Sequence, residues 1–421
     1  MIAPSPLRPR RLPLFGLAVA LASVAFAFSE PSLFELTAMT PGVYLLRGLA
    51  VTVASVLVAP LLGVLVDRAR RRRTPLVVLP LVGAAGIAIA GGTAAGWDAA
   101  GTPAVATGMI MAAGLAALWP VGHEAYLPSI VGRERLVPAN ALLYVLPQLV
   151  MVLVGIVLSW AEYRDLALVI AVCVLLVLAA VAFRGVEAVE EPPPARAGLW
   201  REAVEGVRFT LKEPVLRAIA LCLVVTTLSA EFADEVVDAA RGALLENRMS
   251  TGSFSLSLTV TSYGAIILGP LVAVLLHRRL GAYRLASAVL LASQPFTLLL
   301  ALSGVAGGFA WYTLGSLVPL AGSVAVTIAL TSHRQAITPD RLLGRVGGTL
   351  IALVALSEVV GTLLLGRPGD WLAELAEDAT SPLPLLPGLV LATALAIAAA
   401  VPLLRARHPV VSEEVAESAH P

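Results

Sequence analysis

The stretch Gly63-Val64-Leu65-Val66-Asp67-Arg68-Ala69-Arg70-Arg71-Arg72-Arg73 ends one long apolar segment, and a second apolar segment begins at Thr74. Unpaired charge is costly inside a lipid bilayer, so two buried helices joined in this way form a hairpin whose charges lie in water. Arginine is enriched in short cytoplasmic loops, and this stretch contains five arginines. The hairpin is therefore predicted to face the cytoplasm.

The composition indicates a protein with many membrane spans. Hydrophobic residues make up 58% of the 421 residues, mean hydropathy is +0.89, and charged residues make up only 14%, compared with about 25% in soluble domains. A spanning helix needs ~20 apolar residues. The segments of this length are residues 12–35, 42–66, 74–97, 102–122, 137–160, 164–184, 214–238, 253–276, 282–303, 307–332, 346–366 and 383–404. The predicted fold class is an all-α membrane protein with twelve transmembrane helices.

The distribution of cationic residues predicts the orientation. With both termini in the cytoplasm, 24 of the 29 Lys and Arg residues lie inside and five lie outside, as the positive-inside rule requires. The five outside are Arg47, Arg164, Arg241, Arg248 and Arg367. We expect a multi-pass protein of the cell membrane with cytoplasmic termini, and a first span that is retained instead of being cleaved as a signal peptide.

The two halves of the chain resemble each other. A shift of 210 positions carries Asp67 to His277 and His123 to His333. The chain therefore reads as a duplicated six-helix unit. The predicted domains are an N-terminal six-helix bundle (1–189), a cytoplasmic linker (190–213), a C-terminal six-helix bundle (214–406) and a disordered tail (407–421).

The linker is predicted to contain a short amphipathic helix. The sequence Glu190-Glu191-Pro192-Pro193-Pro194 cannot continue a helix, so it separates the two units. Beyond it, apolar residues share one face at helical spacing, namely Trp200, Val204, Val207 and Leu211. This pattern predicts a helix on the inner membrane surface. We interpret it as an anchor and not as a binding site.

The hinge, with its glycine, an acid four residues later and then arginines, resembles the loop between spans two and three of the major facilitator superfamily. Three further passages are similar to the drug and siderophore exporter branch (macrolide-efflux or enterobactin-exporter type): Pro128 to Leu142, Glu205 to Arg217 and Gln335 to Val346. Two features depart from that branch. Span five has no Gly-Pro pair at Leu153 to Ile156, and His277 replaces the acid of the second hinge. We expect the charge lock at Asp67 to lack a full counterpart in the second half.

The resemblance implies two bundles that rock about a central site, with a gating hinge at the cytoplasmic face. The candidate hinge residues are Gly63, Asp67, Arg68, Arg133, Arg135, His277, Arg278, Gly344 and Arg345. Arg133 or Arg135 is the expected partner of Asp67, because breaking a partly buried ion pair separates two conformations by a few kcal/mol. The alternative is that the arginines only enforce topology, and Arg71, Arg72 and Arg73 fit that alternative best.

The scarcity of lysine argues against ATP hydrolysis by this chain as the energy source. A phosphate-binding loop needs Gly-x-x-x-x-Gly-Lys, but Lys212 is the only lysine and nothing glycine-rich precedes it. We expect no enzymatic activity and no cofactor. We also expect no metal, since the histidines lack neighbouring Cys or acid ligands.

The expected partners are a small-molecule substrate, protons or another ion gradient, and the bilayer. Near-neutral charge gives no case for nucleic acid, and a monomer is expected.

Proton coupling requires a group that can change charge inside the membrane. Glu358 lies about 18 Å into a core roughly 30 Å thick, so it is a candidate, with a structural hydrogen bond as the alternative. Glu30 and Glu231 lie late in the equivalent spans one and seven. They are candidates for a proton or a cationic substrate, and the alternative is a solvated acidic rim.

Spans four and ten should line the cavity. The candidate lining residues are Trp119, Ser316, Ser323 and Thr327. Few charges in these spans favour an amphipathic cargo. The predicted function is proton-coupled efflux of a hydrophobic or cationic small molecule. The alternatives are a lipid or lysolipid translocator of the same fold, and a non-transporting sensor or permease subunit.

Overall fold

The computed structural model describes residues 11–34, 41–96, 101–160, 165–186, 198–240, 251–303, 308–377 and 386–406. Residues 190–197 of the predicted linker and the predicted tail 407–421 lie outside these residues, so the structure does not test the predictions made for them. The predicted division into domains likewise stays a prediction.

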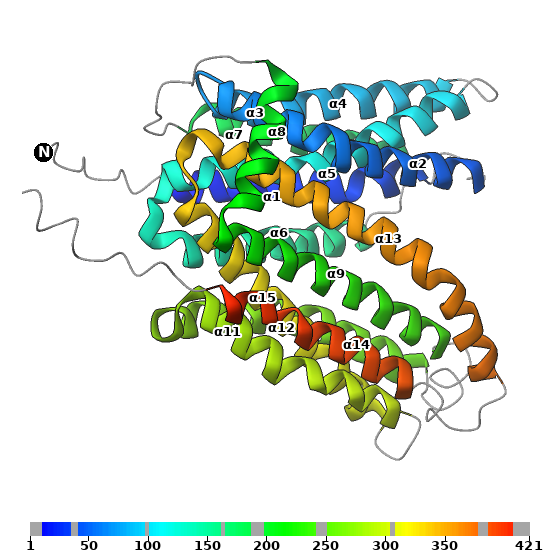
Figure 1. The fold of residues 1–421 in the computed structure, drawn as a ribbon. Coiled ribbons are helices and arrows are strands. Elements are labelled where there is room, and N and C mark those ends of the chain that lie inside the picture. The colour runs from blue at the N-terminus through cyan, green and yellow to red at the C-terminus, as the bar shows by residue number, and fades with distance from the viewer. Residues whose placement is uncertain are drawn as a thin grey trace, which may run out of the picture.

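The described residues form helices joined by short connections (Figure 1). In chain order these are α1 (Arg11–Phe34), α2 (Pro41–Val53), the π-helix η1 (Ala54–Val58), α3 (Ala59–Arg68), α4 (Arg73–Gly96), α5 (Gly101–Val131), the 3₁₀ turn η2 (Arg133–Arg135), α6 (Leu136–Trp160), α7 (Asp165–Arg184), α8 (Leu199–Lys212), α9 (Pro214–Ala240), α11 (Thr251–Ser293), the 3₁₀-helix η4 (Gln294–Leu302), α12 (Gly308–Ile337), the 3₁₀ turn η5 (Asp340–Leu342), α13 (Leu343–Glu377), α14 (Leu386–Ala398) and α15 (Ala400–Arg405).

The all-α membrane fold is confirmed, and helices occupy the predicted spans. Ten candidate membrane spans, by length and hydropathy, lie within the described residues. One of them, Gly252–Leu302, has 51 residues and contains a bend at Gly281, where φ is 72°. A side chain at this φ would be strained, so glycine permits the turn between two predicted spans there. The count of twelve spans stays a prediction.

Each half of the chain has its own apolar core. Phe15, Tyr126 and Phe183 belong to a buried cluster drawn from α1, α4, α5, α6 and α7. A second cluster includes Ile219 and Leu290 and comes mainly from α9, α11, α12, α13 and α15. In Figure 1 α1 to α5 and α7 lie above α9, α11, α12, α14 and α15, whereas α13 begins among the upper helices and crosses to the lower right. The upper and lower groups meet at the left and diverge toward the right.

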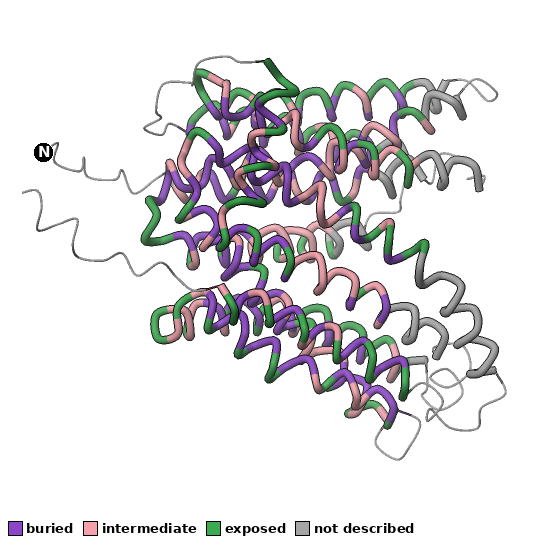
Figure 2. Tube along the Cα trace, viewed as in Figure 1, coloured by how far each residue is buried: buried purple, intermediate pink, exposed green. Residues whose placement is uncertain are grey.

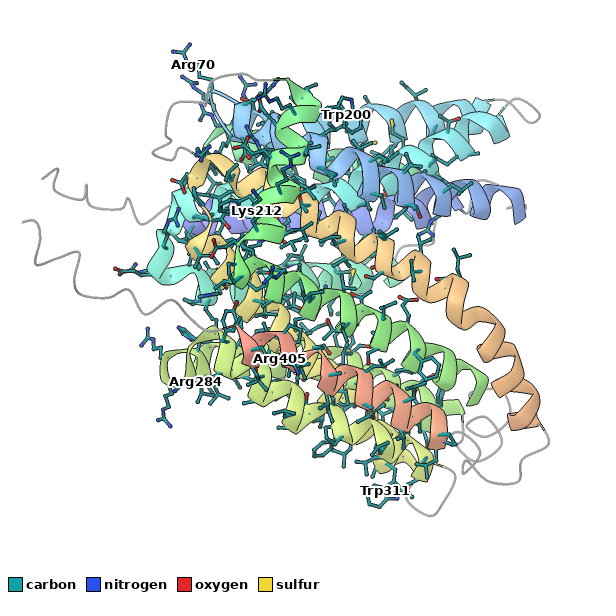
Figure 3. All side chains as sticks on the ribbon, viewed as in Figure 1. Arg70, Trp200, Lys212, Arg284, Trp311 and Arg405 are labelled. Atoms are coloured by element: carbon teal, nitrogen blue, oxygen red, sulfur yellow. The ribbon has the colours of Figure 1, made fainter. Side chains whose placement is uncertain are left out.

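The end of the molecule at which the groups meet, here called the hinge end, contains the α3–α4 and α5–α6 connections and the bend in α11. Arg70 and Arg284 lie at this end, and Trp311 lies at the opposite end (Figure 3). Arg70 and Arg284, both among the cationic residues predicted to lie inside, are therefore found at the same end of the molecule.

Helix α8 runs across the ends of the other helices and covers part of both groups (Figure 1). Its apolar residues Trp200, Val204 and Leu211 are exposed, so the predicted amphipathic helix is present with a free apolar face. The opposite face is buried and contains Glu202 and Gly206. Figure 2 shows buried residues gathered where α8 crosses α3 and α13. A helix predicted only to anchor the protein thus also packs on the junction between the halves.

Candidate functional site

The carboxylate of Asp67 binds the start of α13. The backbone N–H of Gly344 donates to Asp67 Oδ1 at 2.8 Å, and that of Arg345 donates to Oδ2 at 3.0 Å. The first N–H groups of a helix lack partners within the helix and attract negative charge. The carboxylate of Asp67, in the first half, therefore accepts hydrogen bonds from the N-terminal N–H groups of α13, in the second half. Its side chain is fully buried there.

Glycine permits this close approach. A Cβ atom added to Gly63 would collide with the carbonyl group of Gly344, and one added to Gly344 would collide with the carbonyl oxygen of Gly63 and lie 2.9 Å from Asp67 Oδ1. A Cβ at Gly348 would likewise collide with the carbonyl oxygen of Ala59. Helices α3 and α13 thus cross with backbone against backbone, which side chains at these positions would prevent.

The side chain of Arg345 gathers three carboxylates at the same crossing. Its Nη2 donates to Glu202 at 2.6 Å, its Nη1 donates to Glu205 at 2.7 Å, and its Nε lies 3.6 Å from Asp67 Oδ2. Arg68 also donates twice to Glu202, at 2.7 and 3.1 Å. The side chains of Glu202 and Arg345 are 2% and 3% exposed, so the pair is shielded from water. We call Asp67, Arg68, Glu202, Glu205, Gly344 and Arg345 the hinge lock.

A second set of bonds holds the connection between α12 and α13. Arg133 donates to the carbonyl oxygens of Ala336 and Thr338 and to Asp340 Oδ1, the last at 2.8 Å. Arg72 donates to the carbonyl oxygen of Asp340 at 2.5 Å and is only 5% exposed. Arg72 therefore does more than enforce topology, because it binds the second half.

A third set joins positions related by the duplication. Glu124 pairs with Arg334, and the two positions differ by 210. Gln335 donates to the carbonyl oxygen of Glu124 at 3.0 Å, and Asn140 donates to Gln335 at 2.7 Å and to Ser332 at 2.9 Å. Charged and polar side chains of α5, α6 and α12 thus bridge the halves beside the hinge lock.

The structure brings together some of the predicted hinge residues and not others. Asp67, Gly63, Arg68, Gly344 and Arg345 meet, as described above. The expected partner of Asp67 was wrong: Arg133 binds the α12–α13 connection and Arg135 is exposed, while Arg345 and two backbone N–H groups bind Asp67.

The second hinge does not form an equivalent contact in the described residues. His277 Nδ1 lies 2.8 Å from the carbonyl oxygen of Val274 in its own helix, and Arg278 is exposed. Asp67 thus binds across the halves, and its counterpart His277 binds within α11.

The acidic coupling candidates occupy neighbouring helices. Glu358 is exposed on α13, and the exposed apolar residues Leu356, Val360 and Leu363 lie on another side of the helix at the i, i+4, i+7 spacing of a single stripe. Gly361, one turn beyond Glu358, packs against Glu231 of α9: a Cβ there would lie 3.2 Å from Glu231 Cβ. The side chain of the third candidate, Glu30, lies outside the described residues.

The predicted cavity residues separate into two environments. Trp119 is 3% exposed and lies in the core of the first half, where its Nε1 donates to Ser23 Oγ at 3.1 Å and its ring packs on Phe26 and Phe183. It therefore does not line a cavity in this conformation. Ser316 and Ser323 line a cavity of about 290 Å³ within the second half, and Thr327 is exposed further along α12.

No protein-family model matches this chain, and no curated protein matches its sequence. Solved structures of transporters do match it in fold. A bacterial homologue of the iron transporter ferroportin, in an outward-facing state, has a TM-score of 0.70 at 17% identity over 94% of this chain and 98% of that one. The chain has the major facilitator fold.

Two further structures agree with this result. FucP, a major facilitator transporter of E. coli in the outward conformation, has a TM-score of 0.70 at 14% identity over 95% of this chain and 99% of that one. The human organic anion transporter MFSD10 has a TM-score of 0.68 at 14% identity, with 95% and 100% of the two chains covered. Likeness at this identity shows the fold alone, so the exporter branch stays a prediction.

Sequence reasoning missed Glu202 and Glu205 as partners of the hinge. On an amphipathic helix, acids opposite an apolar stripe are normally read as solvated. One signal could have found them: Glu202, Gly206 and Thr210 recur every four residues, and a glycine on a polar helix face permits close packing. Burial of all three confirms that this face packs on the protein.

Proposed function

We propose that the chain is a secondary active transporter that exports a hydrophobic or cationic small molecule in exchange for protons, by alternating access. The observation that carries the proposal is the closure of the two halves at one end by buried polar contacts, together with their divergence toward the other (Figure 1). Such contacts can separate and form again, because their charges find water when the halves part. Alternating access requires a path through the protein that is closed at one end and can open at that end when the conformation changes.

The hinge end is proposed to face the cytoplasm. Arg70 and Arg284 lie at this end and Trp311 at the other (Figure 3), and most cationic residues were predicted on the cytoplasmic side. In this orientation the hinge lock closes the inner side. A membrane-impermeant thiol reagent should label Arg70→Cys only from the cytoplasmic side in a background without Cys173 and Cys222; labelling from outside would contradict this orientation.

Glu358 and Glu231 are proposed as the coupling groups. Glu358 lies on α13, which packs on α3 of the first half and on α9 of the second. Gly361 brings α13 close to the carbon chain of Glu231 on α9. A carboxylate in the middle of a membrane is costly unless it is paired, protonated or hydrated. A group in that position can bind a proton or a cation when its surroundings change, which couples the gradient to the cargo.

The test uses purified protein in liposomes with an imposed pH gradient and ethidium as the cationic probe. Wild-type protein should move ethidium against its concentration gradient, and the double variant Glu358→Gln/Glu231→Gln should not. Glu134→Gln, a charge loss at an exposed position, is the matched control and should keep full activity. The coupling proposal fails if the double variant transports as well as wild type when driven by the pH gradient.

A further inference from the structure

The cavity in the second half has no obvious role in closing or opening the hinge. It is lined by residues of α9, α11, η4, α12 and α14, which all come from residues after 213. Its volume of about 290 Å³ lies near the lower end of the ~300–1,000 Å³ usual for small-molecule sites. It can therefore accommodate a group of about one ring, and not a whole drug-sized molecule.

The geometry of η4 points a column of side chains into this cavity. Gln294, Thr297 and Leu300 all line it and are spaced three residues apart. A 3₁₀-helix has three residues per turn, so residues i, i+3 and i+6 stand in line, whereas an α-helix would turn each successive one to a different direction. The change from α11 to η4 at Gln294 thus gives one face of this segment to the cavity.

Close packing holds η4 in place. A Cβ added to Gly315 of α12 would lie 3.1 Å from the backbone nitrogen of Leu300, and one added to Gly322 would collide with Ser293. These two glycines let α12 lie directly on the segment that ends α11 and begins η4. The wall formed by η4 is therefore fixed by its neighbour.

Two polar groups in the cavity have unused hydrogen-bonding capacity. Thr261 is 7% exposed, and its Oγ1 has no hydrogen-bond partner among the described residues. The side-chain amide of Gln294, also 7% exposed, donates only at 3.3 to 3.4 Å, to Pro319 and to the hydroxyls of Ser293 and Ser323. These distances are longer than the ~2.9–3.0 Å of a typical bond. Buried polar groups are normally paired, so Thr261 points to a missing partner, and Gln294 can exchange its long bonds for shorter ones to a ligand.

The described lining favours an uncharged ligand. The described residues around the cavity include Ser, Thr, Gln and Tyr side chains among alanines and leucines, and contain no Asp, Glu, Lys, Arg or His. A buried ion would find no counter-charge there, and an unpaired buried ion is very costly. An uncharged group with several donors and acceptors would instead satisfy Thr261 and Gln294 while contacting the apolar wall.

We propose that this cavity binds the uncharged, hydrogen-bonding end of an amphipathic molecule, such as a polyol or an amide. The site lies inside one half and is separate from the hinge lock. Identifying its ligand with the cargo rests on the proposed transport function, but binding at the site does not. If the ligand of the cavity is the transported cargo, the second half binds the neutral polar end of that cargo. Glu358 and Glu231 then remain available to a proton or a cation.

The probes are three amphiphiles with the same chain and different head groups: octyl-β-glucoside, octyltrimethylammonium and octyl sulfate. Each is added below its micelle-forming concentration to the full-length protein in lipid nanodiscs, and binding is followed by the midpoint of thermal unfolding. The glucoside should raise the midpoint in a saturable way and octyl sulfate should not. Any shift by octyltrimethylammonium, which the proposed transport site can bind, should be the same in the cavity variants Thr261→Val and Gln294→Leu as in wild type. Equal effects of all three would overturn the proposal, because the chain alone would then explain binding.

Two variants locate the site. Thr261→Val and Gln294→Leu keep the shape of each side chain and remove hydrogen-bonding groups, so each should weaken glucoside binding by about 3- to 10-fold. Thr261→Val should also leave the unliganded midpoint unchanged or higher, because an unsatisfied buried hydroxyl is removed. Thr259→Val, on the exposed side of the same helix, is the matched control and should bind as wild type.

The outcomes separate this proposal from the transport function. Unchanged glucoside binding in both cavity variants, or an equal loss in Thr259→Val, would overturn the site. Selective loss in the cavity variants, in a protein that does not move ethidium in liposomes, would overturn the proposed transport and leave the site standing. Loss of binding by Thr261→Val at full unliganded stability would show that the hydroxyl contacts the ligand and is not needed for folding.

Discussion

The two hinges of this protein occupy equivalent positions in the sequence and do different things. Asp67 in the first hinge is buried and binds the N-terminus of a helix from the other half. His277, its counterpart after the shift of 210, lies beside a carbonyl group of its own helix. The difference teaches that equivalent positions of a duplicated chain need not make equivalent contacts. Asp67 joins the two halves, and His277 bonds within its own half.

The same contrast appears in the backbone. Gly63 meets Gly344 with no room for a Cβ, and the equivalent of Gly63 is Ala273, which is buried in the core of the second half. Glycine is retained where two helices of different halves must touch, because an added methyl group would separate them. Alanine is accommodated where the helix packs on ordinary side chains.

The largest expected effect separates the two hinges directly. Asp67→Ala removes the acceptor for two N–H groups and leaves Arg345 short of one carboxylate, which should destabilise the closed hinge end by about 3–5 kcal/mol. Spin labels at the exposed positions 71 and 279, in a background without the two cysteines, report the distance across that end. The distance should increase in Asp67→Ala and stay unchanged in His277→Ala; an equal increase in both would refute the asymmetry.

The second effect tests whether α8 belongs to the lock. Glu202→Gln removes the charge shared by Arg68 and Arg345, and hydrogen bonds to charged groups contribute about 1.5–3 kcal/mol. We expect the same label distance to broaden toward longer values. Arg201→Gln, at an exposed neighbouring position, is the control. A double-mutant cycle of Glu202 with Arg345 should give a clear coupling energy, and its absence would leave α8 with the anchoring role alone.

The third effect tests the backbone contrast. Gly63→Ala places a methyl group against the Gly344 carbonyl, and overpacking of this kind costs about 1–3 kcal/mol. Ala273→Gly, the reverse change at the equivalent position, should cost about 1 kcal/mol through helix propensity without opening the hinge end. Thermal unfolding gives the stability of both, and the label distance should change only in Gly63→Ala. A longer distance in Ala273→Gly would contradict this prediction.

The smallest expected effect concerns Glu124 and Arg334, a pair at positions related by the duplication. Glu124→Gln should weaken the bridge to Arg334 by about 1 kcal/mol, since the glutamate side chain is 25% exposed and solvent screens the pair. The exchange Glu124→Arg/Arg334→Glu keeps the charge pair at positions related by the duplication, so it should recover most of the closed population. If the exchange is as disruptive as Glu124→Arg alone, the neighbours of the pair, and not its charges, determine the contact.

Much of the fold could be predicted from the sequence. The lengths of the apolar segments placed the helices, and the duplicated hinges indicated two related halves. The sequence identified Asp67 correctly as a hinge residue but assigned it the wrong partner. Several arginines are expected near Asp67 in the predicted topology, and only the packing of the helices decides which of them binds it. Trp119 was predicted to line the cavity, and in this conformation it packs in the core with Phe26 and Phe183. Hydropathy does not reveal which side of α5 turns toward that core.

By itself the sequence determined that this chain crosses a membrane many times, because long apolar segments with few charges have no other stable environment. It also placed the charged hinges outside the apolar layer. Only the tertiary structure decided which charges meet. Asp67, Glu202 and Arg345 are separated by long stretches of chain, and their contacts exist only because α3, α8 and α13 cross where glycines allow it. The unpaired hydroxyl of Thr261 is likewise identified only in the tertiary structure, where residues of five elements line the cavity around it.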